Sequence, residues 1–284
     1  MTRVGVVGAG VMGAGVTQDL SAHGHDVVLV DRSDSILAAA KAEVDRYALM
    51  ARLLGGRDAA TSEQVVPGAV TYTTRLDDLH DVQFVVENIT EEWDSKKEIY
   101  PVLDRVCTPD VVFAANTSAI PITRLAALTA RPDRVLGMHY MNPVPLKKTV
   151  EVIRGWHTTD ESVQRALDLL DATGKTGIVV KDSPGFVSNR VLMLTVNEAV
   201  YLVHEGVATA EEVDQIFRSC FGHPMGPLET ADLIGLDTIL LSVEVLYREF
   251  SDSKYRPCPL LRQMVDAGLH GRKNGQGFYT YPTR

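Results

Sequence analysis

The chain begins with a short apolar segment that glycines interrupt. Val4–Val7 has the β-branched composition of a buried strand, and the turn Gly8-Ala-Gly-Val-Met-Gly13 separates it from a helical pattern. A secretory signal peptide needs an uninterrupted apolar core, so the pattern favours a strand followed by a turn. In a G-x-G-x-x-G turn of this kind, Gly8 makes the tight bend, Gly10 admits a pyrophosphate and Gly13 packs the helix on the strand. The segment therefore predicts a dinucleotide site, with a purely structural glycine turn as the alternative.

An acidic residue follows the next predicted strand. Residues 26–30 form an apolar run, and Asp31 comes directly after it, close to the distance of about 20 residues expected of the acid that binds the ribose 2′-hydroxyl. A carboxylate there would repel the 2′-phosphate of NADP, so NAD is the predicted cofactor. Arg32 offers a neighbouring positive charge that would weaken this repulsion. Val11 and Met12, between the glycines, belong to the same predicted cofactor-binding turn.

Strands and helices alternate through the first two thirds of the chain. Helical spacing is found over residues 34–54, 95–105, 122–128 and 161–172, and strand-like runs over 70–72, 84–86, 111–114, 135–139, 150–153 and 178–180. This alternation predicts an α/β fold with a Rossmann-type, doubly wound parallel sheet. After Asp182 the β pattern stops. Helices are expected over 186–203 and 234–250, with a capping box at Thr209–Glu212 between them. We therefore expect a cofactor domain over residues 1–182 and an all-helical C-terminal domain over 183–284.

Composition and charge narrow the classes of function. The 284 residues are 45% hydrophobic and 23% charged, as in ordinary globular proteins, and the net charge of −9 argues against a nucleic-acid surface. No apolar run reaches the roughly 18–20 residues of a membrane helix. Cys107, Cys220 and Cys258 lie far apart, which predicts reduced thiols in a cytoplasm and no metal site.

One histidine lies where a general base would be useful. Oxidation of an alcohol removes a proton as the hydride leaves carbon, and histidine suits this task near neutral pH. His139 ends a predicted strand, and Glu151 lies on the next one after a Pro-containing connection. A carboxylate against one ring nitrogen would fix the tautomer and stabilise the imidazolium. From the residues alone, a structural histidine and a surface glutamate remain an equal alternative.

Seven motifs in order cover nearly the whole chain: VGVVGAGVMGAGV, FVVENITE, ANTSAI, GMHYMNPVPLKKTVEVI, KDSPGFVSNR, GHPMGPLETADLIGLDT and GRKNGQGFYTY. In these motifs the chain resembles the L-3-hydroxyacyl-CoA dehydrogenases, including the bacterial 3-hydroxybutyryl-CoA dehydrogenases. The resemblance implies a Rossmann domain, a helical dimerisation domain and NAD-linked oxidation of a 3-hydroxyacyl thioester. It implies His139 as general base with Glu151 as its partner, and Ser118 and Asn189 as hydrogen-bonding groups near the substrate.

The same motifs suggest further residues near the cofactor. Glu87, Asn116 and Asn142 are placed there by the resemblance, and Lys273 is expected to reach the cofactor from the C-terminal segment. Each has a simpler alternative: a solvated strand end for Glu87, a turn for Asn116 and Asn142, and an ordinary surface charge for Lys273. Likewise, Ser118 is compatible with a turn, and Asn189 with the cap of a helix.

The sequence leaves two candidates for the carrier of the acyl group. Relatives that use free coenzyme A usually carry lysines in and after the helix that follows the second strand, where they meet the coenzyme's phosphates. Here Lys41 and Lys96 have no lysine between them, and the region offers Arg46, Arg52 and Arg57 instead. An acyl carrier protein, bearing a glyceryl-type group in antibiotic biosynthesis, is therefore an alternative to coenzyme A.

Three other classes remain as alternatives. A non-catalytic relative of this family exists among lens crystallins, but the presence of His139 and Glu151 argues against a purely structural role. A dehydrogenase of a free hydroxy acid would need a cationic clamp, for which Lys147 and Lys148 are weak candidates. A cofactor-binding sensor would bind NAD without turnover.

Overall fold

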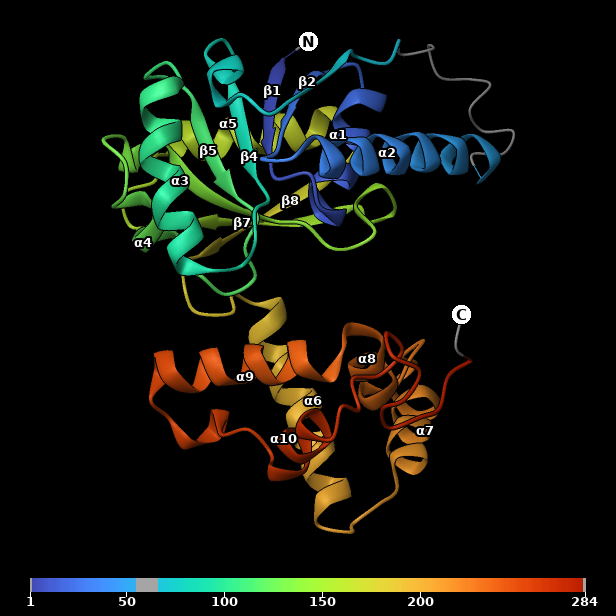
Figure 1. The fold of residues 1–284 in the computed structure, drawn as a ribbon. Coiled ribbons are helices and arrows are strands. Elements are labelled where there is room, and N and C mark those ends of the chain that lie inside the picture. Colours follow the sequence, from blue (N-terminus) through green and yellow to red (C-terminus); the bar gives the residue numbers. More distant parts are fainter. Residues whose placement is uncertain (1, 55–65, 283–284) are drawn as a thin grey trace. The chain divides into compact units, whose positions relative to one another are not determined.

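A computed structural model describes residues 2–54 and 66–282 (Figure 1). The chain divides into two compact units, Met1–Asp182 and Ser183–Arg284. Arg57, which sequence analysis associated with a phosphate site, lies outside the described residues.

The first unit is built on an eight-stranded sheet in the order β3-β2-β1-β4-β5-β6-β7-β8. Every neighbouring pair is parallel except β6 and β7, which run antiparallel. The predicted mostly parallel, Rossmann-type sheet is thereby confirmed. Its strands are β1 (Arg3–Val7), β2 (Asp26–Val30), β3 (Val70–Thr73), β4 (Phe84–Glu87), β5 (Val112–Ala115), β6 (Val135–His139), β7 (Thr149–Arg154) and β8 (Thr176–Lys181).

Helices cover both faces of this sheet because its central strands, β1, β4, β5 and β6, are buried on both sides. Val4 and Val6 of β1 pack in one core cluster with α1, α2 and α5, whereas β5 turns Phe113 to the opposite face, where its ring meets Tyr100 of α3 edge-on. The helical segments of this unit are α1 (Val11–Ala22), α2 (Asp34–Leu54), η2 (Leu76–Leu79), α3 (Trp93–Val106), α4 (Ile122–Ala126), η3 (Pro132–Arg134), η4 (Val144–Leu146) and α5 (Asp160–Ala172).

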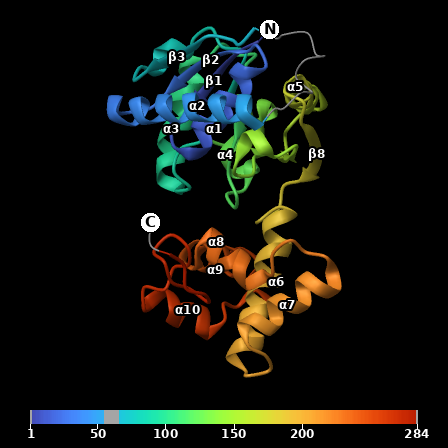
Figure 2. The ribbon, with the colours of Figure 1, turned by 90° about the vertical axis from the view of Figure 1, so that its right-hand side faces the viewer.

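The second unit is helical, as expected (Figure 2). Its core gathers buried side chains from α6 to α10, among them Val196, Val213, Leu228, Ile239 and Leu261. The capping box at Thr209 and Glu212 is present at the start of α7. The helical segments are α6 (Ser188–His204), α7 (Ala210–Phe221), α8 (Pro227–Ile234), α9 (Leu236–Phe250), η5 (Ser253–Tyr255) and α10 (Pro259–Asp266).

One expected helix boundary differs from the sequence prediction. The region expected to run from 234 to 250 starts after a break, because Gly235 adopts a φ of +107° between α8 and α9. Only glycine takes that conformation without strain, so the chain changes direction there. The short helices α8 and α10 both begin at a proline, which is compatible with the first helical position and marks a helix start.

A buried ion pair ties the connection between β6 and β7 to helix α1. The Lys175 ammonium donates to the carbonyls of Val144 and Lys147, both at 2.9 Å, and lies 3.2 Å from a carboxylate oxygen of Asp19. Both charged side chains are at most 5% exposed. Burial raises the pKa of Asp19, and the Lys175 charge opposes part of that rise. The segment that joins His139 to Glu151 is thus fixed on the helix that follows the glycine turn.

Replacing Lys175 tests how much this buried ion pair contributes to the stability of the fold. We expect Lys175→Met to lower the free energy of unfolding by about 3–5 kcal/mol, because it leaves the Asp19 carboxylate buried without a counter-charge. Adding Asp19→Asn should recover part of the loss. Urea unfolding of the single and double variants measures both effects. Equal midpoints for the wild type and Lys175→Met would contradict the role given to this pair.

Candidate active site

The glycine turn after β1 has the geometry of a backbone cradle. Gly8 has a φ of +96°, and a Cβ on it would lie 2.7 Å from the backbone of Asn88. A Cβ on Gly13 would lie 1.8 Å from the carbonyl oxygen of Gly8. By contrast, no described atom comes within 4 Å of a Cβ built on Gly10, where α1 begins. Gly8 and Gly13 are therefore required by the fold, and Gly10 leaves open space at a helix N-terminus, which suits a pyrophosphate.

Asp31 lies against this turn. Its carboxylate accepts a hydrogen bond of 2.7 Å from the N–H of Ala9, which fixes the side chain next to the glycines. A cavity of about 420 Å³ adjoins them, lined by Ala9, Gly10, Val11 and Ala14 of the turn and α1 and by Ser35, Ile36, Ala39, Ala40 and Glu43 of α2. Val11 is exposed, whereas Met12 packs half-buried against the core. Backbone N–H groups and a carboxylate thus fit the phosphates and ribose of a dinucleotide.

His139 and Glu151 form a buried pair across two strands. The antiparallel register of β6 and β7 places them directly opposite each other, and His139 Nδ1 lies 2.8 Å from a carboxylate oxygen of Glu151. His139 is 4% exposed and Glu151 9%. The Glu151 carboxylate accepts a hydrogen bond from the N–H at Nδ1, so the other ring nitrogen, Nε2, carries the lone pair. The geometry thus fits a histidine held in the tautomer that accepts a proton through Nε2.

Ser118 reaches the second nitrogen of the same ring. Its Oγ lies 3.2 Å from His139 Nε2. Ser118 follows β5, and His139 ends β6, the neighbouring strand, so both side chains lie at the carboxyl ends of parallel strands. In doubly wound sheets, ligands bind at this edge. A group bound at Nε2 is therefore within reach of a hydroxyl as well.

Asn116 joins the ends of three strands. Its amide donates to the side-chain oxygen of Asn88 at 2.7 Å, and its own oxygen accepts from the N–H of Tyr140 at 3.1 Å. These bonds link the segments that follow β4, β5 and β6. Asn142 is exposed two residues beyond Tyr140 and precedes Pro143 in a cis peptide bond.

The side chain of Glu87 points toward α3 and not toward the predicted cofactor site. The sequence predicts it at the cofactor, but its side chain is fully buried. Both carboxylate oxygens accept from Lys96 at 2.8 Å, and one also accepts from Tyr100 at 3.1 Å. Burial raises the pKa of Glu87, and Lys96 opposes the rise. As a correction, Glu87 is an internal partner of α3, because the strand directs its carboxylate toward that helix.

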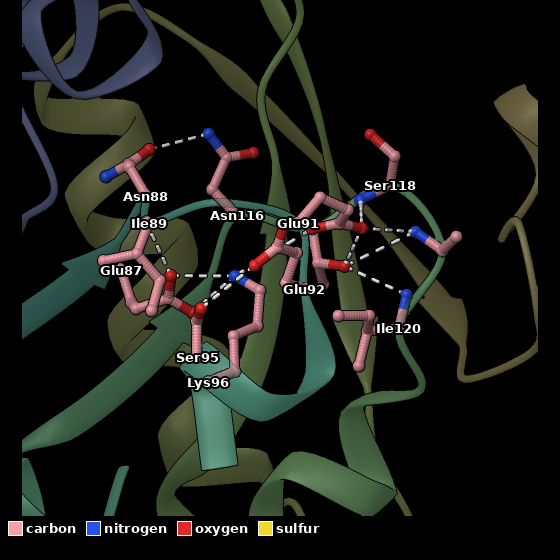
Figure 3. Close-up of polar contacts among 12 residues, drawn as sticks. Glu87, Asn88, Ile89, Glu91, Glu92, Ser95, Lys96, Asn116, Ser118 and Ile120 are labelled. Carbon is pink, nitrogen blue, oxygen red and sulfur yellow. Dashed lines mark hydrogen bonds and ion pairs between the residues drawn. The ribbon is translucent and has the colours of Figure 1, made fainter. Parts of the chain in front are cut away.

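Sequence analysis missed Glu91, four residues further on in the same FVVENITE motif. Its carboxylate accepts from the N–H of Ser118 at 2.9 Å and so contacts the segment that carries this predicted active-site hydroxyl (Figure 3). The available signal was the second acidic residue of the motif. Nothing in the pattern of the strand showed which of the two acids points toward Ser118.

Two predicted site residues lie in the second unit. Asn189 is in the first turn of α6. The ammonium of Lys273 pairs with the carboxylate of Asp237 near the start of α9. Their roles at the substrate and the cofactor stay predictions.

Neither a metal site nor a membrane-spanning helix is found among the described residues. Within residues 2–54 and 66–282, no group of three or more His, Cys, Asp or Glu side chains could hold a metal ion. In the same part of the chain, no helix is both long and apolar enough to cross a membrane.

Comparisons with known proteins agree with this geometry. Residues 3–183 match the NAD-binding domain of 3-hydroxyacyl-CoA dehydrogenase, and residues 185–281 match its C-terminal domain. A probable 3-hydroxybutyryl-CoA dehydrogenase of Deinococcus radiodurans is 45% identical over 98% of this chain and 100% of its own. The human mitochondrial hydroxyacyl-coenzyme A dehydrogenase is 36% identical over 98% of this chain and 91% of its own.

The crystal structure of (S)-3-hydroxybutyryl-CoA dehydrogenase from Ralstonia eutropha superposes with a TM-score of 0.92 at 42% identity, with each chain covered fully. The chain belongs to the 3-hydroxyacyl-CoA dehydrogenase family, whose cofactor is NAD.

Proposed function

We propose that the protein oxidises the 3-hydroxyl group of an acyl-CoA thioester, with NAD as the hydride acceptor. The observation that carries the proposal is the His139–Glu151 pair. Nδ1 of His139 contacts Glu151, and Nε2 of the same ring lies 3.2 Å from Ser118 Oγ, at the carboxyl ends of the parallel strands. The names of the relatives support a coenzyme A thioester as the substrate class.

The residues divide the reaction between them. His139 Nε2 would take the proton of the substrate hydroxyl. NAD, held at the glycine turn, would supply the acceptor for the hydride that leaves the hydroxyl-bearing carbon. Glu151 holds the ring and offsets the positive charge that the ring gains. Ser118 donates a hydrogen bond to the substrate oxygen, and we assign Asn189 the same task. Donors that face the oxygen as its charge develops stabilise the transition state.

We assign NAD to the turn described above. The N–H groups of Gly10 and Gly13 would face its pyrophosphate, and Asp31 would accept from the adenosine ribose. The N–H of Gly8 donates instead to the carbonyl of Val30 at 2.8 Å and shapes the turn. The predicted contacts of Val11, Met12, Asn116, Asn142 and Lys273 belong to the same proposal. Support comes from the open space at Gly10 and from the carboxylate that Ala9 holds beside it.

Coenzyme A is preferred to an acyl carrier protein as the carrier. The names of the relatives support coenzyme A. One observation keeps the carrier protein as the second candidate: the guanidinium of Arg46, in the helix where family members present lysines, forms an ion pair with Glu43. A charge engaged in this way is less available to the coenzyme's phosphates.

Histidine replacement tests the reaction. We expect the wild type to form NADH from 3-hydroxybutyryl-CoA, and His139→Gln to lower kcat by about 10²–10⁴-fold, as expected when a general base is lost. His80→Gln is the matched control, because His80 is exposed on the loop after η2. NADH formation from the carrier-bound substrate but not from the coenzyme A thioester would shift the proposal to the carrier protein. Undiminished turnover by His139→Gln would overturn the assigned base.

Glycine replacement tests the cofactor turn. Gly10 has a φ of −70°, which alanine adopts readily, so Gly10→Ala should fold with an unchanged melting temperature. Its methyl group would occupy the space assigned to the pyrophosphate, and we expect NAD affinity to fall at least about tenfold. Gly13→Ala should instead lower the melting temperature, because its Cβ collides with the Gly8 carbonyl. Calorimetry of NAD binding and thermal unfolding give both values; unchanged affinity in Gly10→Ala would contradict the site.

We further propose that the protein is a cytoplasmic homodimer formed through its helical unit. Large apolar side chains on this unit are exposed in the single chain, including Val191 of α6, Phe221 of α7 and Leu241 of α9, each more than 60% exposed. Exposed apolar side chains of this size are typical of surfaces that associate. Light scattering should give about twice the 31.0 kDa of one chain; the mass of one chain would contradict the dimer.

A further inference from the structure

Helix α4 is capped by the last residue of the first unit. Pro121, which precedes the helix, provides no side-chain hydrogen bond to its first N–H groups. The carboxylate of Asp182 accepts instead from the N–H of Ile122 at 3.1 Å and from the N–H and the hydroxyl of Thr123, both at 2.7 Å. A charged acceptor makes strong hydrogen bonds, and a negative charge is favourable at the start of a helix. The residue that follows β8 is thereby fixed on α4.

The backbone adds to this attachment. The N–H of Asp182 donates to the carbonyl of Arg154, at the end of β7, at 3.0 Å. Helix α4 begins shortly after Ser118, whose own N–H donates to Glu91 at 2.9 Å. Ser118 therefore has an anchor that does not involve Asp182. The point from which the chain leaves the first unit is fixed against the segment that carries this hydroxyl.

The connection from Asp182 to Asn189 is short and has little conformational freedom. Gly185 and Phe186 have φ angles of +73° and +49°, and the carbonyl of Gly185 accepts from the N–H of Arg190 at 2.9 Å. The side chain of Phe186 is buried. A residue other than glycine keeps a left-handed conformation only where its surroundings fix it. The turn therefore transmits the position of Asp182 to the start of α6.

Helix α6 is fixed in the second unit close to the same turn. Nε of Arg190, in its first turn, donates to the Tyr255 hydroxyl at 2.9 Å, and the guanidinium lies 4.5 Å from the centre of the Phe250 ring. Asn189, to which we assigned a hydrogen bond to the substrate oxygen, directly precedes Arg190. The connection thus has one anchor at each end, Asp182 in the first unit and Arg190 in the second.

We propose that Asp182 is a positioning residue: by holding the start of this connection on α4, it sets where the Asn189 amide meets the substrate oxygen. The inference rests on the proposed function, in which the two donors to that oxygen, Ser118 and Asn189, come from different units. A displacement of about 1 Å in a positioned group can cost about 100-fold in rate. Asp182 therefore affects kcat, and the effect depends on the presence of Asn189.

A double-mutant cycle tests this dependence in the full-length protein with NAD and 3-hydroxybutyryl-CoA. Asp182→Ala removes the acceptor of the hydrogen bonds from Ile122 and Thr123 and should lower kcat by about 10- to 100-fold. In an Asn189→Ala background, the same replacement should lower kcat by less than about twofold, because the donor that it positions is already absent. Asp182→Asn keeps an acceptor oxygen and should retain more of kcat than Asp182→Ala. The affinity for NAD should stay within about twofold of the wild type.

The controls separate this role from a purely structural one. Asp168→Ala is the matched variant, since Asp168 is an exposed acid of α5 that accepts from Gln164; its kcat should equal that of the wild type. If Asp182→Ala does not fold, Asp182→Asn is taken through the same cycle. An equal fold-loss in both backgrounds, a kcat unchanged by the replacement of Asp182, or an equal loss of NAD affinity would each overturn the proposal. Wild-type turnover is measured first, so that failure of the proposed function itself appears separately.

Discussion

The site depends on one antiparallel pairing in an otherwise parallel sheet. Parallel strands would require a long crossover between His139 and Glu151, whereas β6 and β7 are joined by a short connection and place the two residues face to face. The resulting 2.8 Å contact is buried at the sheet edge where ligands bind in this fold. A carboxylate in that position fixes which nitrogen of the ring holds the proton, and the rest of the proposed chemistry follows from the lone pair on the other nitrogen.

Buried ion pairs secure the segments around this contact. Lys175 and Asp19 fix the connection between β6 and β7 on α1, and Lys96 and Glu87 connect β4 to α3. Both lysine side chains are buried, and each has a further contact. Lys175 donates to the carbonyls of Val144 and Lys147, and Lys96 lies 3.9 Å from a carboxylate oxygen of Glu91. Buried charges are costly unless every partner is present. Such pairs thus give the loops at the strand ends a defined position, which a hydride transfer with a nearby proton acceptor requires.

Much of this arrangement was visible in the sequence, where local patterns control the structure. The glycine spacing after β1, the alternation of strands and helices and the capping box at Thr209 each reflect a local backbone requirement, and the fold confirms them. The sequence also suggested that His139 and Glu151 form a pair, and the family resemblance favoured this over the structural alternative. Glu87 and Glu91 show where sequence reasoning ends. Glu87 ends β4 and Glu91 lies four residues further on, in the loop before α3. Which of them turns inward depends on the packing of α3, because the folded helix brings Lys96 against Glu87.

The central claim is that His139 Nε2 receives the proton of the substrate hydroxyl. A crystal structure of the protein with NADH and a 3-oxoacyl-CoA thioester tests it most directly. The account predicts the 3-oxo oxygen within hydrogen-bond distance of both His139 Nε2 and Ser118 Oγ, with the Glu151 contact retained. A thioester bound with this oxygen away from His139, while the nicotinamide faces the same carbon, would contradict it.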